Sequence, residues 1–264
     1  MNKRIAIIGG GNLGSSIARG LVNSNLDAST IYVTRRKIEL LEPLQQLGIK
    51  TTDNNAEAVT NSDIIIVAVK PYKTKEVFKE IRQYLKPTHI VVSVISGISI
   101  EQILKYIKQP LTVYRAVPNT AISIKESMTC ISSMNASKEQ DHEIKTIFDN
   151  LGETLFMTQE MMDASTVLAA CGIAYVMRFI RAMVQGGIEI GFSSQIASQI
   201  ANQTVKGAAE LLIKNGMHPE QEIDKVTTPK GYTIAGLNEM EHNGFSSSLI
   251  KGILLSYNKI INNG

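Results

Sequence analysis

The first part of the chain alternates between short apolar runs and amphipathic stretches. The apolar runs have the length of strands, and several are continuous, as in strands buried on both faces. They lie at 4–8, 31–34, 49–51, 64–69, 90–95, 111–117, 128–132 and 154–157. Helical periodicity lies between them, for example at 74–85 and 138–151. This alternation predicts an α/β fold with a doubly wound, mostly parallel sheet.

After Met157 the strand pattern ends. Three long helical patterns follow, at 160–184, 194–214 and 245–262. In the middle one, small and apolar residues repeat every four positions, which permits close helix packing. We therefore predict two domains, an α/β domain at 1–158 and an all-helical domain at 159–264. Arg178 and Arg181 interrupt the longest apolar stretch, so we interpret it as a buried helix and not as a membrane span.

A glycine-rich turn directly follows the first predicted strand and precedes a helix. Its spacing is Gly9-x-Gly11-x-x-Gly14. Gly9 permits a tight turn, Gly11 lets the backbone approach a pyrophosphate, and Gly14 lets the helix pack on the strand. The amides at the helix start then face the phosphates. The turn predicts dinucleotide binding; the alternative is a purely structural turn.

The end of the second strand indicates which dinucleotide is bound. Enzymes that use NAD usually carry an acidic residue there, which binds the ribose hydroxyls. This chain has Arg35, Arg36 and Lys37, and arginine can bind a 2′-phosphate bidentately. We predict NADPH, with NADH less favoured; the alternative is a solvated basic helix start. Asn55 is a candidate adenosine contact or a helix N-cap.

Composition and charge narrow the classes of function. The 264 residues are 44% hydrophobic with a net charge of +3, which excludes a disordered chain and gives no support to a nucleic-acid or membrane partner. Residues 1–158 hold 19 Lys and Arg against 15 Asp and Glu, whereas 159–264 hold 8 against 9. Two distant cysteines and four scattered histidines predict no disulfide and no metal site. The apolar run near the N-terminus is too short for a signal peptide, so we predict a cytoplasmic protein.

The chain resembles the pyrroline-5-carboxylate reductase family along nearly its whole length, in a series of short motifs that occur in the family's order. The segments that carry the resemblance are Gly9–Gly14 (GGGNLG), Ala68–Pro71 (AVKP), Ser96–Ile100 (SGISI), Arg115–Thr120 (RAVPNT), His218-Pro219 and Val226–Thr233 (VTTPKGYT). The resemblance implies a Rossmann domain followed by a helical domain that dimerises. It implies hydride transfer from NAD(P)H to the cyclic imine 1-pyrroline-5-carboxylate, which gives L-proline.

The resemblance also assigns roles to individual residues. The cofactor would contact the glycine turn with Asn12 and Leu13, the segment Ala68, Val69, Lys70 and Pro71, and, near the nicotinamide, Pro118 and Asn119. The substrate carboxylate would lie on the backbone of Thr228, Lys230, Gly231, Tyr232 and Thr233, with the Thr233 hydroxyl at the imine nitrogen. It further implies a homodimer or an assembly of several dimers. A protonated imine is already electrophilic, so this reaction needs orientation more than acid–base groups.

The chain departs from the family pattern at the substrate loop and at the first long helix. Lys230 replaces a glycine and Tyr232 a small residue, and Ala170–Tyr175 (ACGIAY) lacks a glycine and a proline. If position 230 needs a positive φ, lysine costs on the order of 1 kcal/mol there. Two interpretations stay open: a divergent reductase, in which Lys230 adds a cation for the carboxylate, or an NADP-binding paralogue with another imine substrate or no activity. A β-hydroxyacid dehydrogenase is disfavoured, because no lysine lies between Lys145 and Lys206.

Overall fold

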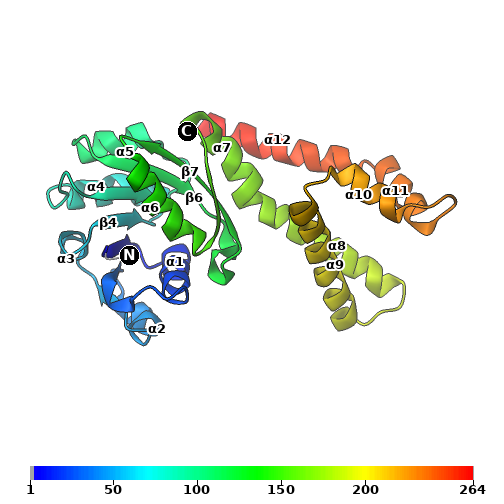
Figure 1. Ribbon diagram of the computed structural model, residues 1–264, viewed down its shortest axis with the longest axis horizontal. Helices are drawn as coiled ribbons and strands as arrows, with labels where there is room; N and C mark the ends of the chain where they lie inside the picture. Colours follow the sequence, from blue (N-terminus) through cyan, green and yellow to red (C-terminus); the bar gives the residue numbers. More distant parts are fainter. Residues whose placement is uncertain (1–2, 264) are drawn as a thin grey trace. The chain divides into compact units, whose positions relative to one another are not determined.

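The computed structural model describes residues 3–263 and divides the chain into two compact units. Unit 1 holds the chain up to Cys171 together with its end from Tyr257, and unit 2 holds Gly172–Ser256 (Figure 1). The predicted boundary between 158 and 159 lies earlier in the chain than this division and stays a prediction.

Unit 1 is built on one eight-stranded sheet. The strands are β1 Ile5–Ile8, β2 Ile31–Thr34, β3 Lys50–Thr52, β4 Ile64–Val67, β5 Ile90–Ser93, β6 Thr112–Val117, β7 Ser127–Met134 and β8 Gly152–Phe156. Their order is β3-β2-β1-β4-β5-β6-β7-β8, and every neighbouring pair is parallel except β6 and β7. The sheet confirms the predicted doubly wound, mostly parallel fold, and each predicted apolar run overlaps one of its strands.

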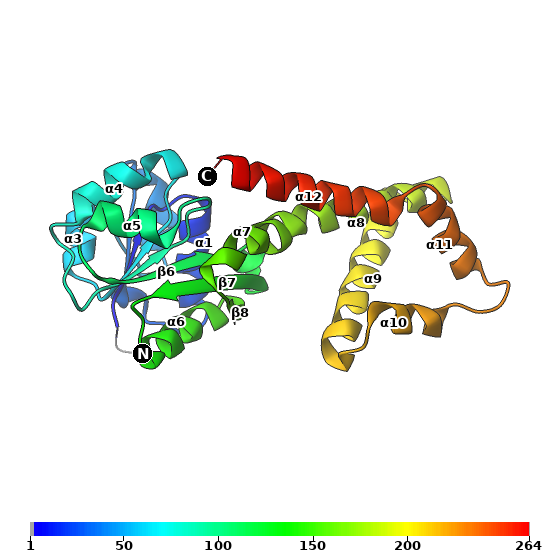
Figure 2. The ribbon, with the colours of Figure 1, turned by 90° about the horizontal axis from the view of Figure 1, so that it is seen from above.

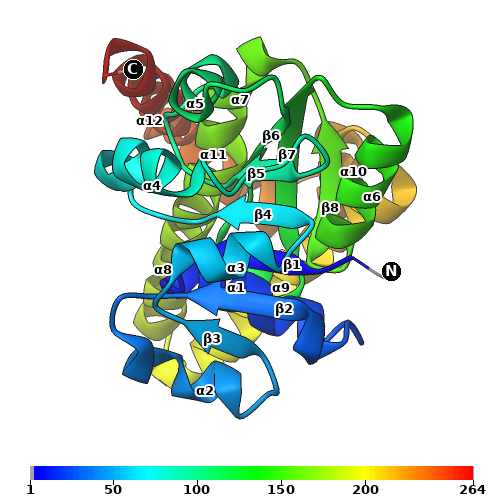
Figure 3. The same ribbon diagram turned by 90° about the vertical axis from the view of Figure 1, so that its left-hand side faces the viewer.

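Helices cover both faces of this sheet (Figure 3). One face carries α1 Asn12–Val22, α2 Glu42–Gln45 and α6 Lys138–Asp149, and the other carries α3 Asn55–Thr60, α4 Thr74–Ile81 and α5 Ile100–Ile107. Alternate side chains of β1 pack on opposite faces of the sheet, because successive strand residues point in opposite directions. Ile5 and Ile7 pack with α1, and Ala6 and Ile8 pack with α3 and α4. All four are buried, which explains why β1 is apolar throughout.

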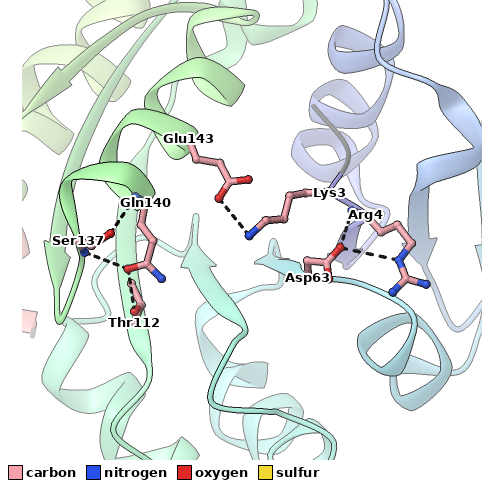
Figure 4. A network of polar contacts seen from close by, with 7 residues as sticks. All are labelled: Lys3, Arg4, Asp63, Thr112, Ser137, Gln140 and Glu143. Atoms are coloured by element: carbon pink, nitrogen blue, oxygen red, sulfur yellow. Dashed lines mark hydrogen bonds and ion pairs between the residues drawn. The ribbon is translucent and has the colours of Figure 1, made fainter.

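Polar contacts connect neighbouring elements at the amino ends of the parallel strands (Figure 4). Asp63, just before β4, accepts a hydrogen bond of 2.9 Å from the backbone amide of Arg4, just before β1. Lys3 forms an ion pair of 3.3 Å with Glu143 of α6. Because the glycine turn follows the carboxyl end of β1, these contacts leave the opposite edge of the sheet available for a ligand.

Unit 2 is helical. Its first helix is α8 Gly172–Glu189, which follows α7 Met162–Ser165 and a π-helical segment, Thr166–Cys171, both still in unit 1. After α8 come α9 Ser194–Asn215, α10 Pro219–Val226, α11 Tyr232–His242 and α12 Phe245–Asn263, of which the part from Tyr257 belongs to unit 1. Ala197 and Ala201 of α9 pack against Val184 of α8. A Cβ added at Gly187 would lie 3.0 Å from the Ala197 Cβ. The small residues therefore permit the close helix packing that the sequence predicts.

The longest apolar stretch, which runs from about 164 to 184, was interpreted above as a buried helix, and this interpretation is wrong for the single chain. The structure has a continuous helix over Gln159–Glu189, and only 11% of its most apolar 18-residue window is buried. Within the chain, α8 contacts α9 and α12, yet Val184 is its only buried residue. By length and a mean hydropathy of 1.7 this helix meets the criteria for a membrane span, which from one helix is weak evidence.

Candidate cofactor site and substrate loop

The glycine turn of unit 1 has the geometry that a bound pyrophosphate requires. Gly9 has a φ of +109°, and a Cβ there would lie 2.6 Å from the Ala68 carbonyl oxygen. A Cβ on Gly14 would lie 2.2 Å from the carbonyl oxygen of Gly9, so α1 approaches β1 as closely as predicted. A Cβ on Gly11, the N-cap of α1, would meet no atom within 4 Å. Gly11 therefore presents bare backbone and the helix amides to open space.

This open space is a cavity of about 740 Å³ at the carboxyl ends of the strands. Its volume lies within the range of about 300–1,000 Å³ that small-molecule sites occupy. Eleven of the residues predicted to bind the cofactor line it: Gly9, Gly11, Asn12, Leu13, Arg35, Arg36, Asn55, Ala68, Val69, Lys70 and Pro71. Gly14 lies outside the lining, in keeping with its packing role. The residues present thus fit a dinucleotide.

Sequence reasoning did not find several residues that also line the cavity. They are Ile8, Gly10, Thr34, Tyr72, Lys73, Val77, Glu80, Val94 and Ser96. Lys73 lies three residues after Lys70, and Ser96 lies three residues after the end of β5. Their positions after the carboxyl ends of β4 and β5 could have marked both as candidate cofactor contacts. Glu80 had no such positional signal, because it lies on the last turns of α4 and reaches the cavity only through the fold.

The basic cluster after β2 divides into two parts. Arg35 and Arg36 line the cavity, whereas Lys37 does not. The Arg35 Nη1 donates a hydrogen bond of 2.9 Å to the carbonyl oxygen of Gly10, which ties this cation to the glycine turn. Lys73 adds a third cation from the chain segment before α4. The end of the cavity predicted to hold the 2′-phosphate is therefore cationic on two sides.

Glu76 of α4 pairs with two of these cations. Its carboxylate accepts hydrogen bonds from Arg36 and, at 2.7 Å, from Lys73. The hydrogen bond from Lys73, assisted by the charges of Lys73 and Arg36, holds the pKa of the Glu76 carboxyl below its usual range. Glu76 is therefore ionised at neutral pH, and the cationic end of the site contains a fixed negative charge.

Asn55 lies at the cavity as predicted, but it is not an N-cap. The cap of α3 is Asn54, whose side chain accepts hydrogen bonds from the amides of Ala56 and Glu57. Asn54 precedes the helix in extended conformation, which a cap requires, whereas Asn55 is already helical. The Asn55 Oδ1 accepts from the Thr34 hydroxyl at 2.6 Å, and its Nδ2 donates to Glu80 at 3.1 Å.

Pro118 and Asn119 lie outside the cavity lining. The Asn119 Oδ1 accepts from the Ala121 amide, and its Nδ2 donates at 3.2 Å to the carbonyl oxygen of Ala169 in the π-helical segment. Arg115 of the same predicted segment is buried and pairs with Asp163 of α7 at 2.6 Å. In this structure these side chains join β6 to the long helix; the nicotinamide contact of Pro118 and Asn119 stays a prediction.

The predicted substrate loop is a tight turn in unit 2 that ends at a helix N-terminus (Figure 2). The Gly231 amide donates to the Thr228 carbonyl oxygen at 2.8 Å, which closes a β-turn with Pro229 as its second residue. Lys230, the third residue, has a φ of +60°. Position 230 thus needs the left-handed conformation, and lysine there costs on the order of 1 kcal/mol relative to glycine.

The turn exposes the start of α11. Gly231 is the N-cap, and Tyr232 and Thr233 are the first two helical residues, whose amides have no partner within a helix. Tyr232 is 99% exposed, and neither it nor Thr233 lines the 740 Å³ cavity of unit 1 or the apolar groove of unit 2 described below. The helix start thus has free amides and, at Thr233, a hydroxyl, which are groups that can bind a carboxylate. Contact of Thr228, Lys230, Gly231, Tyr232 and Thr233 with substrate stays a prediction.

Unit 2 also contains an apolar groove of about 760 Å³. Phe179 of α8 and Phe245 of α12 lie across it with ring centroids 6.0 Å apart, and Arg178 is its one charged residue. Tyr175, at a family position, lies at the groove and hydrogen-bonds to Ser256 at 2.7 Å. Among residues 3–263, no group of three or more His, Cys, Asp or Glu is placed to hold a metal ion.

Comparison with known proteins decides the family. The family model for pyrroline-5-carboxylate reductase dimerisation matches residues 159–262, and the model described as NADP oxidoreductase, coenzyme F420-dependent, matches residues 4–97. Pyrroline-5-carboxylate reductase 2 of Dictyostelium discoideum is 42% identical over 98% of this chain and 92% of its own length. The chain belongs to the pyrroline-5-carboxylate reductase family.

Two further relatives agree. Pyrroline-5-carboxylate reductase 1 of Dictyostelium discoideum is 45% identical over 97% of this chain, and the chain spans 49% of that longer relative. A solved pyrroline-5-carboxylate reductase from Coxiella burnetii is 26% identical, with a TM-score of 0.93 over 99% of this chain and 98% of that one. Family membership makes this chain an oxidoreductase with a Rossmann-type first domain and a helical second domain.

Proposed function

We propose that this chain is an NADPH-dependent pyrroline-5-carboxylate reductase, which converts 1-pyrroline-5-carboxylate into L-proline in the cytoplasm. The observation that carries the proposal is the cavity of unit 1. It joins a glycine turn at a helix N-terminus to Arg35, Arg36 and Lys73, a combination that suits a pyrophosphate and a 2′-phosphate. Family membership supports the substrate.

The chemistry fits the groups that the chain provides. When bound, NADPH supplies the hydride that reduces the imine carbon. The protein's part is to hold the two rings in contact and to anchor the substrate carboxylate. The first amides of α11 and its positive dipole end serve as that anchor, since a helix N-terminus favours anions. The Thr233 hydroxyl orients the imine nitrogen, and the Lys230 ammonium adds attraction for the carboxylate.

The first test is turnover. We expect the purified chain to oxidise NADPH when 1-pyrroline-5-carboxylate is added and to produce L-proline in equal amount. Loss of NADPH absorbance and amino-acid analysis of the product measure both sides of the reaction. NADPH binding without turnover would contradict the proposal and favour the non-catalytic paralogue. Turnover with a different cyclic imine alone would favour a reductase of altered substrate.

We further propose that residues 159–264 form a homodimer. Of the large apolar side chains in unit 2, Val184 is the only one buried, with Ala197 and Ala201 as its small neighbours. So little burial cannot stabilise a helical unit alone, because its ordering entropy would exceed the gain. A second copy that covers the exposed apolar residues of α8, α9 and α12 removes this deficit, and it also explains the exposed helix Gln159–Glu189 without a membrane.

Light scattering tests the dimer. We expect a mass of about twice the 28.9 kDa of the chain at micromolar concentration. Leu255→Glu, at a side chain 60% exposed on α12, should produce monomer, because it places a charge in the interface. Leu40→Glu, at a side chain 50% exposed in unit 1, is the matched control and should leave the dimer intact. A monomeric parent protein would contradict the proposal; an assembly of several dimers would extend it.

A further inference from the structure

The cations at the phosphate end of the cavity share one carboxylate. The Glu76 carboxylate accepts hydrogen bonds from Arg36, which lies forty residues earlier in the chain, and from Lys73, which lies three residues earlier. Both cations line the cavity, whereas Glu76 is not among the residues that line it. The ion pairs therefore join the segment after β2 to the start of α4, across the place where a 2′-phosphate would lie.

We propose that Glu76 is a specificity-determining residue that competes with the cofactor's 2′-phosphate for Arg36 and Lys73, and so lowers the preference for NADPH over NADH. This inference rests on the proposed function. A phosphate monoester carries a charge of about −1.5 to −2 at neutral pH. Its approach must displace Glu76 from the two cations and bring two anions close together. NADH has a hydroxyl at that position and leaves both ion pairs in place.

A second carboxylate on the same helix strengthens this assignment. Glu80 lies one turn after Glu76, lines the cavity and accepts a hydrogen bond from Asn55. Enzymes that use NAD place an acidic residue at the end of the second strand to bind the ribose hydroxyls. Here that position holds Thr34, followed by two arginines. Helix α4 therefore supplies carboxylates at the cofactor site, where the segment after β2 supplies arginines.

The test is the affinity of both cofactors for the Glu76→Gln variant of the full chain. Nicotinamide fluorescence on binding gives both dissociation constants without any need for turnover. We expect NADPH to bind about 3- to 10-fold more tightly, because two exposed cations lose their competitor. NADH should change less than about twofold, and high salt should reduce the NADPH gain. Glu153→Gln on β8, at the opposite edge of the sheet, removes the same net charge and should change neither affinity.

The double variant Arg36→Met/Glu76→Gln isolates the pairing. If Glu76 acts by occupying Arg36, most of the NADPH gain should disappear in the Arg36→Met background. Weaker NADPH binding by Glu76→Gln would show that Glu76 positions Arg36 for the phosphate and would overturn the inference. An equal gain for both cofactors, or no change, would overturn it as well. Because binding alone is measured, a chain that binds NADPH but fails to reduce 1-pyrroline-5-carboxylate contradicts the proposed function and leaves this test intact.

Discussion

Replacing Arg35 and Arg36 together by methionine should weaken NADPH binding on the order of 100-fold. Each arginine can make charge-assisted hydrogen bonds to a phosphate, worth about 1.5–3 kcal/mol apiece, and Arg36 is discounted because its side chain is 76% exposed. Methionine keeps the apolar stem and removes the charge. NADH lacks the phosphate, so its affinity should change by less than about threefold. The dissociation constants of both cofactors, measured at fixed ionic strength, check this result.

The chain offers a matched control beside these residues. Lys37 belongs to the same basic cluster but lies outside the cavity lining. Lys37→Met therefore removes an equal charge per residue and should leave NADPH affinity within about twofold. Arg35 also bonds to the Gly10 carbonyl oxygen, so the double variant should lose about 1 kcal/mol of stability. If NADPH binding survives the double variant, or if Lys37→Met weakens it equally, the basic cluster does not recognise the phosphate.

Local patterns explain why the α/β unit could be predicted from the sequence. A strand buried on both faces must be apolar throughout, and the glycine turn is constrained by contacts within its own βαβ unit, such as that of Gly14 with Gly9. The position of the N-cap at Asn54 and not Asn55 depends on where extended backbone becomes helical, and such boundaries shift by a residue without changing the apolar pattern.

The parts of the site that the sequence did not predict depend on distant contacts. Glu80 reaches Asn55 from 25 positions away, and Glu76 reaches Arg36 from forty. No spacing rule along the chain joins such pairs, because the fold alone brings α4 beside the end of β2. The prediction that the helix Gln159–Glu189 is buried was wrong for a related reason. An apolar pattern shows that a surface needs cover, but it does not show whether the same chain provides it.

The positive φ at Lys230 was inferred from the family pattern and not from hydrophobic periodicity. The lysine stands where the family pattern has glycine, and the structure confirms that the position is left-handed. A chain that keeps this turn despite a cost on the order of 1 kcal/mol retains the geometry that starts α11 at Tyr232. Lys230 and Tyr232 are therefore compatible with a turn that leads directly into α11 at the predicted substrate loop. What they change is the set of side chains around the free amides.

Thr233→Ala should lower kcat on the order of 100-fold while leaving the NADPH dissociation constant unchanged. A positioned hydroxyl that orients the imine nitrogen or assists its protonation contributes about 10²-fold or more to such a step. Thr233 is exposed in the second position of α11, and its hydroxyl has no hydrogen bond within the described residues, so its removal should not unfold the unit. Steady-state kinetics with 1-pyrroline-5-carboxylate and a thermal melt measure the two effects separately.

The control for this variant is Thr233→Ser, which keeps the hydroxyl and removes only a methyl group. It should retain most of the parent kcat, because the methyl group makes no bond to the nitrogen. A loss confined to KM in the alanine variant would assign Thr233 to substrate binding and not to the reacting nitrogen. Unchanged kinetics in both variants would remove Thr233 from the mechanism. The free amides of α11 would then act on the carboxylate alone, and the orientation of the imine would fall to residues on the cofactor's side.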